Sequence, residues 1–234
     1  MIPAAPTRFR AAPALRLRQQ PLFLWAGGLL VAGDVVFWLM FAAVMSESGL
    51  ATADVSVHTF VVDSRTGWAT ALFALLSTIT SPPWLSVLTV AVAVGWALWK
   101  KEVWRPAILA GAMGLSVVLT TLVKHEAGRS RPPSSDFLMG PDDALSFPSG
   151  HVMGVCIFAL VLTYLLVSRS GTRTTAVLAF AAAALLSLVV AFSRMYLGYH
   201  WLTDVVASLG VALGVTGIAI FVDAARHGRA LETA

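Results

Sequence analysis

The chain has 234 residues, of which 58% are hydrophobic and 12% are charged, and its mean hydropathy is +0.81. That is more apolar surface than one soluble core can bury, so the composition excludes a soluble domain and indicates a membrane protein. The formal charge of +4 and the pI near 9.7 do not indicate nucleic-acid binding, because the basic residues form short clusters between apolar runs.

Six apolar segments are long enough to cross a bilayer as helices, which takes roughly 20 residues in a core without water. We predict an all-α polytopic membrane protein with six transmembrane helices at residues 22–45, 82–99, 104–124, 149–168, 174–193 and 201–222. The first segment is too long for the h-region of a cleaved signal. One transmembrane domain, residues 22–223, is expected between a cytoplasmic N-terminal tail, 1–21, and a cytoplasmic C-terminal tail, 224–234.

A seventh apolar stretch, Trp68–Ile79, is too short to cross the bilayer and is followed by Ser81-Pro82-Pro83. We predict that it forms a short helix that lies in the membrane interface or dips partway into the bilayer. Counting it as a full span would reverse the orientation of every later segment.

Two features inside the predicted spans point to helix packing. Asp34 lies near the middle of the first span, where an ionised carboxylate costs about 3 kcal/mol on insertion scales. We expect Asp34 to be buried in a structural interhelical hydrogen bond, with a proton relay as the alternative. Gly210 and Gly214 form a small-xxx-small pair, which permits close helix approach; we expect that approach within the bundle, with a contact between protomers as the alternative.

The distribution of basic residues orients the chain, because cytoplasmic loops carry the Lys and Arg excess. With a cytoplasmic N-terminus, 11 of the 16 basic residues fall on the cytoplasmic side. The other five are Arg65, Lys124, Arg129, Arg131 and Arg194. Their position on the extracytoplasmic side indicates that this face needs cations.

Three polar clusters lie at the same ends of the last four spans. They are Lys124 with Arg131-Pro132, Pro148-Ser149-Gly150-His151, and Ser193-Arg194 with His200 and Asp204. A phosphoryl group in transfer carries negative charge on three equatorial oxygens, which fixed cations such as Lys124, Arg131 and Arg194 stabilise. Ser149 near a helix start offers a hydroxyl and free backbone N–H groups, and Gly150 permits close approach of the backbone to phosphate.

The two histidines suit a two-step displacement. His200 and Asp204 are spaced i to i+4, so the carboxylate can accept one imidazole N–H and leave the other ring nitrogen free to attack phosphorus. His151, from another span, can protonate the leaving oxygen and then activate water.

These clusters resemble the motifs of the type 2 phosphatidic acid phosphatases, or lipid phosphate phosphatases, whose site is shared with vanadium haloperoxidases. The family motifs K-x6-R-P, P-S-G-H and S-R-x5-H-x3-D are matched at all eleven fixed positions. The resemblance implies phosphate binding by Lys124, Arg131, Ser149, Gly150 and Arg194, acid catalysis by His151, nucleophilic attack by His200 and orientation of His200 by Asp204. It implies no metal and no other cofactor.

We therefore expect a multi-pass enzyme of the cell membrane with an extracytoplasmic active site that hydrolyses a lipid phosphomonoester or diphosphate. Its partners would be that substrate and membrane lipids, with no nucleic acid and an oligomeric state left open. The substrate is either a polyprenyl diphosphate, such as undecaprenyl diphosphate, or a glycerolipid, such as phosphatidic acid or phosphatidylglycerol phosphate. The alternatives are a phosphotransferase that uses the same phosphohistidine and a non-catalytic transporter or scaffold that binds anionic lipid.

Four further residues lie near these motifs or carry an imidazole. His125 and Arg129 fall in the spacer of the first motif, where each is either a contact of the lipid headgroup or a bystander. His58 and His227 have no companions at ligand spacing, and both are expected to be solvated.

Overall fold

The computed structural model describes the backbone of residues 13–232 and the side chains of residues 21–226 except Ser170. Every regular element in this part of the chain is helical. The elements, in chain order, are α1 (Pro13–Met45), η1 (Gly49–Ala53), α2 (Asp54–Asp63), α3 (Gly67–Ile79), α4 (Pro82–Lys100), α5 (Trp104–Ala127), η2 (Ser134–Asp136), α6 (Gly150–Ser170), α7 (Arg173–Tyr196) and α8 (Leu202–Glu232).

Six of these helices are long and apolar enough to cross a membrane, which confirms the all-α, six-span prediction. They are α1, α4, α5, α6, α7 and α8. The central pair is α6 and α8, since 56% of each apolar window is buried, against 6% for α1. The observed helix bounds differ most from the predicted spans in the first and last helices, because α1 begins at Pro13 and α8 continues to Glu232. Helical hydrogen bonds continue past the last apolar residue because they need no hydrocarbon around them.

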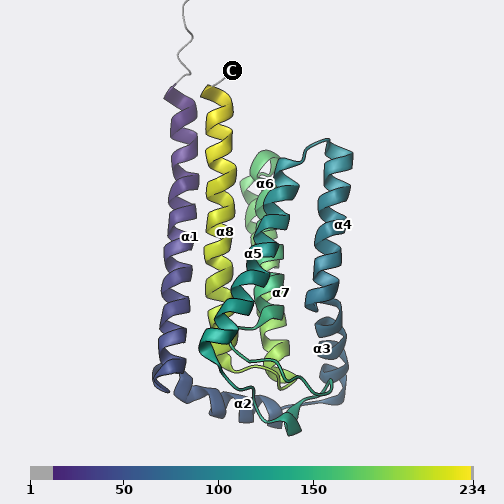
Figure 1. Cartoon of the computed structure of the whole chain (residues 1–234). Coiled ribbons are helices and arrows are strands. Elements are labelled where there is room, and N and C mark those ends of the chain that lie inside the picture. Colours follow the sequence, from purple (N-terminus) through teal and green to yellow (C-terminus); the bar gives the residue numbers. More distant parts are fainter. Residues whose placement is uncertain (1–12, 233–234) are drawn as a thin grey trace, which may run out of the picture.

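Helices α1 and α8 lie side by side along their length (Figure 1). Glycines make this contact possible: a Cβ added to Gly33 would come within 2.5 Å of Gly214 N, and one added to Gly210 within 2.8 Å of Gly33 O. At Gly217 an added Cβ would lie 2.6 Å from Ala26 O. The close approach predicted at Gly210 is confirmed, and it occurs within the bundle.

The short apolar helix is also confirmed as α3, and Figure 1 shows it below α4 in the same column. Pro82 stands in the first turn of α4, where its missing N–H costs no helical hydrogen bond, so the column breaks at Thr80–Ser81. Phe73 of α3 packs against Phe192 and Tyr196 of α7. Helix α2, which the sequence analysis did not predict, lies across the same end of the bundle (Figure 1).

The expectation for Asp34 is wrong. Its side chain is exposed on α1, and within residues 21–226 it has no hydrogen bond or ion pair. Instead it lines a mostly apolar groove between α1, α5 and α8. Adjacent helical positions point about 100° apart, so the approach of Gly33 to α8 turns Asp34 away from that contact.

Candidate active site

The three polar clusters lie at one end of the bundle, which is the end that α2 crosses (Figure 1). Each residue stands at a helix end or in a connection, where side chains are not committed to packing between spans. Lys124 is in the last turn of α5, Arg131 in the α5–α6 connection, Ser149 at the N-cap of α6 with Gly150 and His151 in its first turn, Arg194 in the last turn of α7, His200 in the α7–α8 turn, and Asp204 in the first turn of α8.

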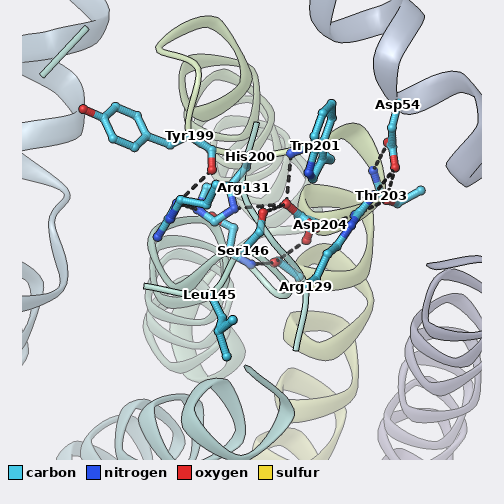
Figure 2. A network of polar contacts seen from close by, with 12 residues as sticks. Asp54, Arg129, Arg131, Leu145, Ser146, Tyr199, His200, Trp201, Thr203 and Asp204 are labelled. Carbon is cyan, nitrogen blue, oxygen red and sulfur yellow. Dashed lines mark hydrogen bonds and ion pairs between the residues drawn. The ribbon is translucent and has the colours of Figure 1, made fainter. Parts of the chain in front are cut away.

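Both ring nitrogens of His200 have a hydrogen-bond partner. Its Nδ1 lies 3.3 Å from Asp204 Oδ2, and its Nε2 lies 3.2 Å from Arg131 Nη1 (Figure 2). Arginine only donates, so Nε2 is the acceptor and the proton of the neutral ring is on Nδ1, where it is donated to the carboxylate. The lone pair of Nε2 therefore points toward the guanidinium of Arg131.

The electrostatics of this end favour a neutral imidazole. His200 is only 2% exposed. This burial, together with the positive charges of Arg131, Arg194 and Lys124, holds the pKa of His200 well below its ordinary value. A neutral imidazole has the free lone pair that a nucleophile needs, and the same three cations attract an anion to it.

Two of the residues expected to bind phosphate have buried polar atoms without a partner. Within the described side chains, Ser149 Oγ and Arg194 Nε are buried and form no hydrogen bond. The rest of Arg194 is fixed, since Nη1 donates to Ser77 Oγ at 2.5 Å and the guanidinium lies 4.5 Å from the centre of the Tyr199 ring. Both groups can donate a hydrogen bond, so they are available to an oxygen-rich ligand.

Lys124 and His151 complete this surface. The ammonium of Lys124 donates to the carbonyl of Leu145, which ties α5 to the α5–α6 connection. His151 is half-buried and lies beside the backbone of Ser77 in α3, within electrostatic reach of His200, Arg194 and Arg131. The two imidazoles thus lie near the same cationic region, His151 from the first turn of α6 and His200 from the α7–α8 turn.

Arg131 is held by the protein through all of its donor nitrogens. Nε donates to Ala144 O at 2.7 Å, and Nη1 donates to Tyr199 O at 2.8 Å. Nη2 forms a 2.8 Å ion pair with Asp142, a carboxylate on the α5–α6 connection that is about one third exposed. Arg131 is one of the residues predicted to bind phosphate. The carboxylate of Asp142 thus occupies the place on its guanidinium where an anion would bind.

Four side chains that are not fixed positions of the motifs support Asp204, and the sequence did not predict their roles. Oδ2 of Asp204 accepts from the hydroxyl of Ser146, and its Oδ1 accepts from Arg129 Nη1 at 2.6 Å. Arg129 Nη2 donates to Asp54 at 2.5 Å, and Asp54 also accepts from Thr203. Arg129 is therefore not a bystander: its guanidinium lies between Asp204 and Asp54, as Figure 2 shows.

The expectation for His58 is also wrong. The residue is 7% exposed, its Nε2 lies 2.9 Å from Asp136 Oδ2, and its ring is 5.3 Å from that of Trp201. It is buried because α2 crosses this end of the bundle. His125 is exposed in the last turn of α5, and the side chain of His227 lies outside the described residues.

Comparison with known proteins places this arrangement in context. The family model described as the PAP2 superfamily matches residues 105–226. The chain is 24% identical over 179 residues to phosphatidylglycerophosphatase B of Bacillus subtilis strain 168, covering 76% of this chain and 87% of the relative.

Two solved structures are similar in fold. The crystal structure of a transmembrane PAP2-type phosphatidylglycerolphosphate phosphatase from Bacillus subtilis matches with a TM-score of 0.75 and 23% identity, covering 82% of this chain and 94% of that one. Aquifex aeolicus LpxE matches with a TM-score of 0.52 and 18% identity, covering 72% and 94%.

Proposed function

The chain belongs to the PAP2 superfamily, and we propose from this membership and from the site geometry that it is a lipid phosphate phosphatase that works through a phosphohistidine at His200. One observation carries the proposal: a buried neutral imidazole, oriented by Asp204, has its unprotonated Nε2 against Arg131 and near two further cations and two unpartnered buried donors.

The residues support a two-step reaction. Nε2 of His200 attacks phosphorus as the ester oxygen leaves, and His151, protonated beside the negatively charged substrate, donates a proton to that oxygen. The imidazole becomes cationic, and the carboxylate of Asp204 stabilises it through the Nδ1 proton. His151, now neutral, takes a proton from water, whose oxygen attacks the phosphohistidine and releases phosphate. Lys124, Arg131 and Arg194 stabilise the charge on the equatorial oxygens in both steps.

The substrate proposal is a lipid whose tail enters laterally from the bilayer on the extracytoplasmic side. A groove between α4, α5 and α6, lined by Leu85, Met113, Val117, Thr120 and Gly150, supports lateral entry because it reaches the start of α6 from the apolar face. The excess of basic residues at the opposite end supports the sidedness. The names of the Bacillus subtilis relatives favour phosphatidylglycerol phosphate over a polyprenyl diphosphate.

A phosphate-release assay on purified protein tests this function. The panel contains phosphatidylglycerol phosphate, phosphatidic acid and a polyprenyl diphosphate, ranked by kcat/KM. We expect release from at least one of them. Loss of lipid phosphate without an equal yield of free phosphate would indicate transfer to another acceptor, and no turnover of any substrate would refute the enzyme.

Vanadate is expected to inhibit the enzyme, and EDTA is expected to leave its activity unchanged. Vanadate adopts the pentacoordinate geometry of the transition state, and the three cationic side chains take the role that a divalent ion has in many phosphatases. Within the described residues, no group of three or more His, Cys, Asp or Glu side chains is arranged to hold a metal. Activity that is lost in EDTA and restored by a divalent ion would contradict this mechanism.

Asp142→Asn is expected to tighten competitive inhibition by inorganic phosphate up to about fivefold, the equivalent of about 1 kcal/mol for a partly exposed ion pair. The substitution removes the carboxylate that pairs with Arg131 and frees that guanidinium for the ligand. Asp143→Asn is the matched control, because Asp143 is the exposed neighbour and the change in net charge is the same. Weaker inhibition in the Asp142 variant would show instead that Asp142 positions Arg131 for binding.

A further inference from the structure

The carboxylate of Asp204 accepts more hydrogen bonds than it needs to orient His200 alone. It is fully buried and accepts from four donors: the His200 ring, Trp201 N at 2.9 Å, the hydroxyl of Ser146, and Arg129 Nη1. Arg129 is the only charged group among these donors besides the imidazole when it is protonated. A buried carboxylate stays ionised only when charge or several hydrogen bonds compensate it, and Arg129 supplies the charge and one of the four hydrogen bonds.

Arg129 is itself fixed by a second carboxylate. Its Nη2 lies 2.5 Å from Asp54 Oδ2, and its Nη1 also donates to Thr203 Oγ1 at 2.7 Å. Asp54 in turn accepts from Thr203 N at 2.9 Å and from Thr203 Oγ1 at 2.6 Å, so it caps the N-terminus of α8. The exposed fractions of the side chains of Asp54 and Arg129 are 3% and 15%. His200, Asp204, Arg129 and Asp54 thus form one buried chain of alternating acceptors and donors (Figure 2).

The charges along this chain have a consequence for His200. A guanidinium alone against Asp204 would compete with the imidazole for the negative charge of the carboxylate. Asp54 neutralises Arg129 from its other side, so the orienting contact is retained while Asp204 remains available to a cationic imidazole. Asp54 opens α2, and the helix that crosses the site is thereby tied to the nucleophile.

We propose that Arg129 and Asp54 are positioning residues for the nucleophile: through Asp204 they fix the orientation and protonation of His200 and do not touch the substrate. This inference rests on the proposed phosphatase function. It assigns a positioning role to two residues that are not fixed positions of the three motifs.

Arg129→Gln tests the proposal by separating turnover from binding. We expect kcat to fall about 100-fold, as a small misplacement of a reacting group can cause, while KM and the affinity for vanadate stay unchanged. The acidic limb of the pH profile of kcat/KM should move to higher pH, because Asp204 without its cation makes protonation of the His200–Asp204 pair easier. Arg129→Lys, which keeps the charge and one contact, should recover part of kcat.

Two further variants keep the test decisive if Arg129→Gln folds poorly. Arg129→Gln combined with Asp54→Asn leaves one unpaired buried carboxylate instead of two, so it should fold better, and its kcat should be no lower than that of Arg129→Gln. Arg65→Gln is the matched control: Arg65 bonds the backbone carbonyls of Tyr196 and Asp136 at the same end but does not touch Asp204. It should lower thermal stability without moving the pH profile.

The outcomes separate this inference from the proposed function. A wild-type protein without phosphatase activity would refute the function, whereas an active wild type and an equally active Arg129→Gln would refute only the positioning role. Raised KM and weaker vanadate binding with unchanged kcat would make Arg129 a substrate ligand. A loss of stability with an unshifted pH profile would mean that the contacts of Arg129 with Asp54 and Asp204 serve only to stabilise the fold.

Discussion

His200→Ala is expected to lower the rate of phosphate release by at least about four orders of magnitude while the protein stays folded and inserted. The variant removes the imidazole whose Nε2 lies 3.2 Å from Arg131 Nη1, so water would have to attack the phosphate ester directly. The three cations remain and still bind phosphate, so the loss should fall in kcat. The measurement is phosphate release from the best lipid of the panel, alongside thermal unfolding and elution as a single species.

His125→Ala is the matched control for this experiment. His125 lies next to Lys124 in the last turn of α5, but it is exposed and has no side-chain hydrogen bond within the described residues. Its removal should leave turnover close to wild type, which separates loss of the nucleophile from loss of any histidine at this end. Turnover retained in His200→Ala would eliminate the phosphohistidine mechanism, and loss of turnover in both variants would point to damage to the α5 end.

The sequence predicted the six spans because each depends on a local property, a run of apolar residues long enough for a bilayer. It predicted that the motif clusters share one end because the spans alternate in direction. Helix α2 was missed because Asp54–Asp63 has polar residues at five of its ten positions and no long apolar run. The placement of Asp34 was wrong because hydropathy does not specify which face of a helix meets its neighbour.

The support of Asp204 was beyond a motif-based prediction for a different reason. Arg129 stands 75 residues before Asp204 and 75 residues after Asp54, and no spacing rule connects the three. One signal was present: Arg129 is a cation between two motif positions on the face that the positive-inside rule should have cleared. Its partner Asp54 is the first residue of α2, and the position of α2 across the site depends on tertiary packing.

The other large effect is expected for the α1–α8 contact, where Gly33→Ala should destabilise the folded protein by about 1–3 kcal/mol or more. The new Cβ would lie 2.5 Å from Gly214 N and closer still to Gly210 O, and neither backbone atom can move without separating the two helices. Such a separation also threatens activity, because α8 carries Asp204 in its first turn. The measurement is the midpoint of thermal unfolding in detergent, followed by phosphate release.

Gly28→Ala is the matched control on the same helix, because a Cβ at Gly28 would meet no atom within 4 Å. Alanine is a better helix former than glycine by about 1 kcal/mol, so this variant should be as stable as wild type or more stable. The same substitution five residues apart on α1 thus has opposite expected signs. If both variants unfold at the wild-type temperature, the two helices do not pack backbone to backbone, and the tie between α1 and the helix that carries Asp204 would have to be sought elsewhere.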